Sequence, residues 1–268
     1  MLDQLTYISS TNREIHFGEG NIIINTNALR DYEWKYSQSY KRITDFTRNN
    51  PPKQLPVLLW GNNVEEIADE IFEIVESDVL TKQYGKLYSG DYYTQGYFVA
   101  SSKPSYTADG FMKLTLSWAT DKPYWVKETK YLYRPSDISA MGLDYPFDYP
   151  YDFLPSIGTI NIINPSFAPQ NIRLTIYGAC TNPSVLIDEH AYSLTTALLA
   201  NEYAVIDTTE KTIKKVASDG TVTNIFNSRS RDSYIFEKIT SGTHVIGVTP
   251  ETNVDLTIIE ERSEPQWQ

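Results

Sequence analysis

A segment rich in proline and aromatic residues sets the strongest limit on how this chain folds. Pro146, Pro150 and Pro155 alternate there with tyrosine, phenylalanine and aspartate. Proline lacks a backbone N–H and fixes φ, so neither a helix nor a paired central strand suits this stretch. We therefore predict a linker over residues 134–155, which separates an N-terminal domain, 1–133, from a C-terminal domain, 156–268. Two domains agree with a length of 268 residues.

The N-terminal half is dominated by short apolar runs typical of strands. We expect strands over residues 5–8, 14–17, 21–25, 86–88, 96–99 and 111–118. Between them, Tyr32, Trp34 and Tyr36 alternate with polar residues, which suits a strand with one aromatic face. This half should therefore form a β-sandwich or split-barrel-like domain.

One helix is predicted in this half, over residues 64–76. Apolar residues recur there at the spacing of a single buried stripe: Val64, Ile67, Ala68, Ile71, Ile74 and Val75. Asn63 is a candidate N-cap, with Glu66 three positions later as in a capping box. Acidic residues fill the remaining positions, and we interpret them as a solvated face rather than a metal site.

The C-terminal half reads as a series of short strands. Eight are expected, over residues 159–164, 172–177, 185–187, 203–207, 212–216, 222–225, 243–247 and 256–260. Asp219-Gly220 marks a tight hairpin turn between two of them. This spacing predicts an antiparallel β-sandwich. A brief helical turn is also expected near residues 194–199.

Charge and cysteine content exclude several classes of function. The formal net charge of -11, with no run of more than two lysines or arginines, argues against nucleic-acid binding. The single cysteine, Cys180, excludes an internal disulfide and a multi-cysteine metal site, and its apolar surroundings predict a small buried side chain. We expect no secretory signal at the start and no membrane span, because no apolar run approaches about 18 residues.

The sequence offers no catalytic constellation. His16, His190 and His244 lie in separate segments, and no nucleophile elbow, phosphate loop or dinucleotide fingerprint is present. Asp188 and Glu189 beside His190 form a conceivable acid–base group, which we interpret as a strand-end pair. We therefore predict that the protein is not an enzyme and has no catalytic, cofactor-binding or metal-binding residues.

The spacing of Asp144, Asp148 and Asp152 resembles a set of calcium ligands. A calcium loop, however, needs a glycine at its bend and a bidentate acid at its end. Proline and aromatic residues alternate here instead, so we interpret the segment as one that docks its rings onto a domain surface.

Three stretches resemble the distal tail protein (Dit) family of long-tailed, non-contractile bacteriophages. They are residues 86–99, the strand over 111–118 with the aromatic turn 121–125, and the linker core 143–153. The aromatic turn departs from the family's usual pattern, because Lys122 is inserted between Asp121 and Pro123 and Val126 stands where a second tyrosine is common.

This resemblance implies a hexameric ring formed by the N-terminal domain, with a C-terminal galectin-like sandwich that projects outward. The family joins the tail tube protein and the tape-measure protein to the baseplate hub and the receptor-binding protein. It therefore implies a place in the virion, at the tail tip, after synthesis in the cytoplasm of the bacterial host. DNA would pass through the central channel, where an acidic wall prevents adhesion. The sandwich should be dispensable for ring closure.

A carbohydrate-binding module is the competing interpretation, because a galectin-like sandwich with tyrosines can stack on sugar rings. Four tryptophans, Trp34, Trp60, Trp118 and Trp125, lie in the N-terminal half, however, and only Trp267 lies elsewhere, in the tail. Their placement favours a scaffold over a lectin. A hydrolase with dispersed carboxylates has no positive support.

Overall fold

The computed structural model describes residues 4–107, 110–135, 160–249 and 252–266. The chain divides into two compact units, one of residues 1–127 with 261–268 and the other of residues 128–260. Most of the predicted linker, from residue 136 onward, lies outside the described residues.

The boundaries of these units differ from the domain boundaries predicted from proline content. The first boundary falls inside a strand, after Lys127, and the last residues return to the first unit after Glu260. Contacts within the first unit explain the return. The Arg262 guanidinium lies 5.9 Å from the centre of the Tyr92 ring, and an Arg30 nitrogen donates to the Pro265 carbonyl at 3.3 Å.

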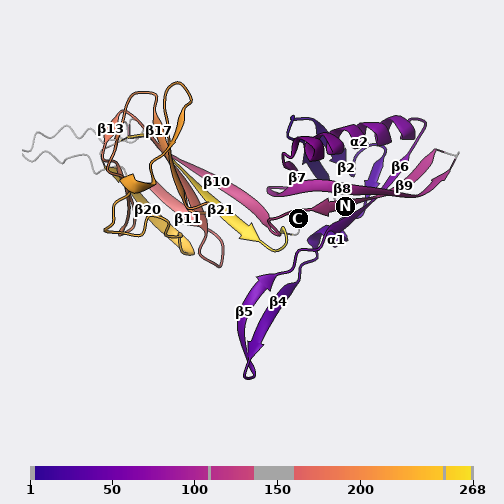
Figure 1. The fold of residues 1–268 in the computed structure, drawn as a ribbon, viewed down its shortest axis with the longest axis horizontal. Coiled ribbons are helices and arrows are strands. Elements are labelled where there is room, and N and C mark those ends of the chain that lie inside the picture. Colours follow the sequence, from indigo (N-terminus) through magenta and orange to yellow (C-terminus); the bar gives the residue numbers. More distant parts are fainter. Residues whose placement is uncertain (1–3, 108–109, 136–159, 250–251, 267–268) are drawn as a thin grey trace, which may run out of the picture. The chain divides into compact units, whose positions relative to one another are not determined.

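Up to residue 127, the first unit contains ten strands or parts of strands and two helices among its described residues (Figure 1). In chain order they are β1 (Leu5–Ile8), β2 (Glu14–Phe17), β3 (Ile22–Ile24), α1 (Asn27–Arg30), β4 (Trp34–Ser39), β5 (Arg42–Arg48), β6 (Lys53–Trp60), α2 (Val64–Thr81), β7 (Gly85–Ser89), β8 (Tyr92–Thr107), β9 (Phe111–Ala119) and the start of β10 (Trp125–Tyr133).

The long strand β8 joins two antiparallel layers in this unit. Its first part pairs with β7, which continues to β1 and β2. Its later part pairs with β9, which continues to β6 and β3. Helix α2 packs on β8 and β6 and lies across these strands in Figure 1. The predicted strands of this half are confirmed, whereas β5, β6 and β10 were not predicted.

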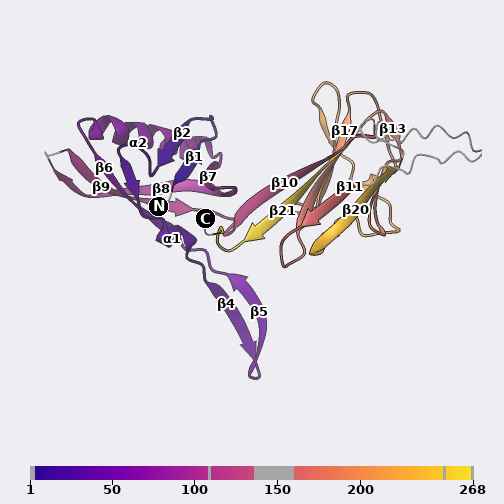
Figure 2. The same cartoon turned by 180° about the vertical axis from the view of Figure 1, so that it is seen from behind.

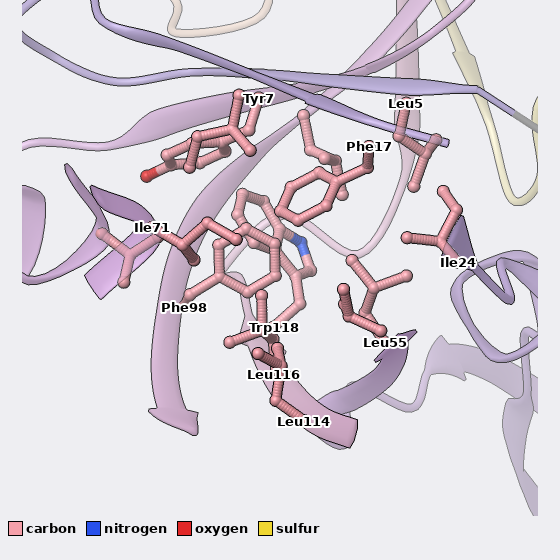
Figure 3. Packing of buried hydrophobic residues seen from close by; sticks show 14 of the residues in the cluster. Leu5, Tyr7, Phe17, Ile24, Leu55, Ile71, Phe98, Leu114, Leu116 and Trp118 are labelled. Atoms are coloured by element: carbon pink, nitrogen blue, oxygen red, sulfur yellow. The ribbon is translucent and has the colours of Figure 1, made fainter. Parts of the chain in front are cut away.

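Aromatic rings fill the centre of the first unit (Figure 3). Phe98 meets Trp118, Tyr7 and Phe17 edge to face, with ring centres 4.9, 5.2 and 6.1 Å apart. Such edge contacts add about 0.5–1.5 kcal/mol per pair beyond the burial of area. The core of this unit is therefore built around one ring of β8.

Helix α2 follows the prediction in its buried stripe but not in its cap. Ile71 and Ile74 are buried, while Ile67 is only partly buried at the edge of the core. The predicted capping box is wrong, because the Asn63 side chain makes no cap hydrogen bond and instead accepts one from Asn21 at 3.2 Å. The helix also continues past residue 76 to Thr81.

The second unit is an antiparallel β-sandwich. Its further elements are β11 (Ile160–Asn164), β12 (Asn171–Tyr177), β13 (Cys180–Thr181), β14 (Ser184–Ile187), β15 (His190–Ser193), β16 (Ala197–Leu198), β17 (Tyr203–Asp207), β18 (Thr212–Val216), β19 (Val222–Asn224), the 3-10 turn η1 (Phe226–Ser228), β20 (Gly242–Thr249) and β21 (Val254–Arg262).

Two sheets enclose the core of this unit. One has the order β19-β18-β17-β12-β21-β10 and the other β11-β20-β14-β15. Inward residues of both, including Leu174, Ile206 and Val185, belong to one buried cluster. The mainly β fold class and the eight predicted strands are confirmed.

The helical turn expected near residues 194–199 is wrong. Residues 197–198 form strand β16, which pairs with Cys180 and Thr181 of β13. Thr195 and Thr196, just before β16, are β-branched, and residues of this kind favour extended backbone.

Candidate assembly surface

Strands β4 and β5 form a hairpin that stands apart from the rest of the first unit. They pair only with each other among the described strands, and both views show them reaching away from α2 and the sheets (Figures 1 and 2). All residues of β4 are exposed. An isolated two-stranded hairpin is at best marginally stable in water.

The base of the hairpin is fastened to the first unit. The Arg48 guanidinium contacts two rings, 5.0 Å from the centre of Trp34 and 5.2 Å from that of Tyr124. The Asn50 side chain donates to the Thr120 carbonyl. The base of the hairpin is therefore held in place, whereas the rest of the hairpin is exposed.

The hairpin turns at Tyr40 and Lys41, both with positive φ, 43° and 65°. A two-residue turn of this kind normally carries Asn-Gly, because few side chains tolerate the left-handed conformation. Tyr40 is 99% exposed at the tip.

One face of the hairpin is apolar and the other polar. Tyr36 pairs with Phe46, and Gln38 with Ile43 after a bulge, so that the exposed Trp34, Tyr36, Ile43 and Phe46 share a side. We call these four residues the apolar hairpin face. Polar residues occupy the opposite side: Lys35, Ser37, Asp45 and Thr47.

Covering the apolar hairpin face would stabilise an assembly. Its residues are 43–62% exposed. With about 25 cal/mol per Å², the exposed area corresponds to on the order of 5–10 kcal/mol before the entropic cost of association. Aromatic residues with this exposure are typical of protein–protein interfaces.

A second apolar surface lies on the outer side of the β3-β6-β9 layer. Ile23 pairs with Leu58 and Trp60 with Phe111, and all four point away from the core. Ile23, Trp60 and Phe111 are 38–49% exposed. We call these four residues the outer apolar patch. The first unit thus carries two different apolar surfaces.

His190 and His244 line one pocket of the second unit together with Asp188 and Glu189, whereas His16 lies in the first unit. His244 also forms a pair that the sequence did not predict. The Asp188 carboxylate lies 2.7 Å from His244 Nδ1, and the Thr240 carbonyl lies 2.9 Å from Nε2. A hydrogen bond from the Val245 amide, followed by the contact with His244, lowers the pKa of Asp188. No signal links residues 188 and 244 in the sequence, since only the pairing of β14 with β20 brings them together.

This pair is poorly suited to acid–base catalysis. Both ring nitrogens of His244 already have an oxygen of the protein within hydrogen-bond distance, so neither is left over for a ligand in the adjacent pocket of about 390 Å³. His190 is held by the Tyr234 carbonyl at 2.9 Å, and His16 lies in the first unit beside Glu14.

The structure also tests other features that the sequence analysis considered. Cys180 is buried, as predicted, and burial raises the pKa of its thiol. Within the described ranges, no three His, Cys, Asp or Glu side chains gather as a metal ion would require. Asp144, Asp148 and Asp152 lie outside those ranges. In the part of the chain that the structure describes, no helix has the length and apolar character for a membrane crossing.

The fold is shared with solved structures of bacteriophage proteins. The SPP1 Dit protein, described as a paradigm of the hub adsorption apparatus in phages that infect Gram-positive bacteria, aligns over 96% of this chain and 99% of its own, with a TM-score of 0.59 and 9% identity. A chain of the phage P2 baseplate in its activated conformation with calcium aligns over 99% and 100%, with a TM-score of 0.62 and 14% identity. The strontium form gives a TM-score of 0.62 with 13% identity. No protein-family model and no curated protein sequence matches the chain.

Proposed function

We propose that this chain, which has the fold of the SPP1 Dit protein, is a non-enzymatic structural component of a bacteriophage tail tip. Six copies close into a ring through the first unit. The likeness to a hub adsorption protein and to a baseplate chain, over nearly the whole of both chains, supports this role.

The observation that carries the ring is the presence of two different apolar surfaces on one unit. A cyclic ring is built from head-to-tail contacts, so each copy must present two unlike, complementary patches. The apolar hairpin face of one copy docks onto the outer apolar patch of the next. The projecting hairpin gives the reach that such a contact needs, and its polar side stays in water.

The ring joins the tail tube and tape-measure proteins to the baseplate hub and the receptor-binding protein. DNA passes through its centre. The net charge of -11 suits a conduit, because a negative surface repels the phosphate backbone. The galectin-like second unit, which the chain enters within β10 and leaves within β21, projects from the ring.

The first prediction concerns this interface. Tyr36→Ser with Phe46→Ser removes the apolar cross-strand pair, and Leu58→Ser with Trp60→Ser removes the facing patch. Each double variant should be monomeric at tens of micromolar, where the full chain forms a hexamer. Light scattering gives the masses, and circular dichroism checks the fold.

Mixing the two double variants gives the sharper result. One retains an intact patch and the other an intact hairpin, so the mixture should form dimers and no larger species. Lys35→Ser with Thr47→Ser, on the polar side of the same strands, should leave the hexamer intact. A monomeric full chain, or a ring that survives both double variants, would contradict the proposed interface.

A further inference from the structure

The second unit contains a pocket that the proposed ring does not use. Its volume is about 620 Å³, and Lys211 and the segment 226–236 line it. This segment is held in place by β15 and its flank, since the Ser230 amide donates to the Ser193 carbonyl at 2.9 Å and the Ser233 hydroxyl to the Ala191 carbonyl. The wall of the pocket is therefore fixed by backbone contacts.

Aromatic rings form the apolar part of the pocket. Phe226 and Phe236 stack with ring centres 5.9 Å apart, and Tyr234 meets Phe236 edge to face at 6.0 Å. Phe236 is buried, whereas Tyr234 is 53% exposed. The Tyr234 ring is therefore accessible, and the Phe236 ring packs against it.

Three cationic side chains line the same pocket in a chain that is strongly acidic overall. The Arg229 guanidinium lies 4.0 Å from the centre of the Phe226 ring and donates to the Phe226 carbonyl at 2.9 Å. Lys211 and Arg231 form no ion pair or hydrogen bond with the other described residues. The lining carboxylate, Asp232, accepts from the Ser230 hydroxyl at 3.0 Å.

We propose that this pocket binds a saccharide that carries an anionic group, either phosphate or carboxylate. The planar guanidinium of Arg231 suits the two oxygens of either group, and Lys211 adds a second positive charge. The exposed Tyr234 ring offers an apolar surface, with a polar hydroxyl at its edge, to the face of the sugar.

A nucleic acid fits these observations less well. Affinity for nucleic acid comes from cations that follow many successive phosphates. Here the cations are confined to one pocket, and the net charge of the chain is -11. A single anionic group on a sugar ring matches the size and the composition of the site.

The test is a titration of the full chain, followed by NMR, with glucose 6-phosphate and with glucuronate as probes. At least one should bind saturably at millimolar concentration and shift the signals of residues 226–236. Glucose and inorganic phosphate should each bind at least about tenfold more weakly, because glucose lacks the anionic group and inorganic phosphate lacks the sugar ring. Comparing the two probes identifies the anionic group.

Variants locate the site. Arg231→Ala and Tyr234→Ala should each weaken binding at least about tenfold, while Lys214→Ala, an exposed lysine of β18 outside the pocket, should not change it. The absence of saturable binding by either probe would overturn the proposal. So would equal affinity for inorganic phosphate, or stronger binding of adenosine monophosphate. The ring is tested separately, since Arg231→Ala should leave the mass of the assembly unchanged.

Discussion

Two aspartates that resemble surface residues in the sequence are buried in the structure. Each accepts hydrogen bonds from several other groups. Asp78, in the last turns of α2, is fully buried. It accepts hydrogen bonds from the Tyr7 hydroxyl and, at 2.9 Å, from the Ser10 amide. Burial and this carboxylate raise the pKa of Tyr7 above its ordinary range. Asp78 therefore ties the helix to β1 and the turn that follows it.

Asp255 has the same role in the second unit. Its carboxylate accepts from Lys130 at 2.6 Å, Arg134 at 2.5 Å and Tyr177 at 3.0 Å. Burial pushes the pKa of Asp255 upward, but the hydrogen bonds from these partners outweigh it and hold the pKa below the usual value. Since the folded pKa is the lower one, the charge stabilises the protein above the unfolded pKa.

The second prediction is that Asp255→Asn destabilises the second unit by about 1–3 kcal/mol at pH 7, because it leaves Lys130 and Arg134 without their counter-charge. The contribution is fully present above the unfolded pKa, about 3.9 for aspartate, and is lost as the pH falls through the lower folded pKa, so the difference from wild type should be smaller at pH 3 than at pH 7. Urea unfolding followed by circular dichroism at pH 7 and pH 3 measures both effects.

Glu189→Gln is the matched control, because it removes an exposed carboxylate from the same unit. It should change stability by less than about 0.5 kcal/mol. An Asp255→Asn difference that stays constant between pH 7 and pH 3 would count against a charge effect.

At the scale of elements, α2 shows how a periodic pattern translates into packing. Ile71 is 3% exposed and belongs to the core of the first unit. The acidic residues on the other side of the helix face solvent or the exposed Arg13, which approaches Glu70 and Glu73 at 3.8 and 3.6 Å. Exposed pairs of this kind contribute little, so the apolar stripe holds the helix in place.

The third prediction is that Ile71→Ala lowers the free energy of unfolding of the first unit by roughly 2–5 kcal/mol, as a core truncation that leaves a cavity. Tryptophan fluorescence during urea unfolding reports on this unit alone, because Trp34, Trp60, Trp118, Trp125 and Trp267 all belong to it. Leu80→Ala, at a position of the same helix that is 75% exposed, should change little. Unfolding of Ile71→Ala at the wild-type midpoint would mean that the stripe is not a core face.

At the scale of the whole molecule, the chain enters the second unit within β10 and leaves it within β21. Its C-terminal residues then complete the first unit through the contacts of Arg262 and of the Pro265 carbonyl. A fragment that ends near residue 134 therefore lacks part of the unit to which the ring is assigned.

The fourth prediction follows from this arrangement. A chain that ends at Glu260 should have a lower free energy of unfolding of the first unit, by about 1–2 kcal/mol for the lost hydrogen bond and ring contact. Tryptophan fluorescence is again the measurement. A truncated chain with the wild-type midpoint would show that residues 261–268 do not support this unit.

Local patterns in the sequence determined much of this protein. Alternating apolar residues identified several strands, among them Leu5–Ile8, Phe111–Ala119 and Val254–Arg262, although β5, β6 and β10 were not predicted. The 3–4 spacing identified α2. The Asp219-Gly220 turn and the buried Cys180 were also predicted. These features depend on residues close in sequence, where periodicity and turn chemistry act directly.

Only the tertiary structure decided which distant residues meet. Trp34 and Tyr36 read as an ordinary strand, yet they are exposed because β4 and β5 pair with no further described strand. Asp255 pairs with Lys130, and Lys211 lines one pocket with the segment 226–236, through strand order and loop packing. A period of two residues specifies which side chains share a face, but it carries no information about what covers that face.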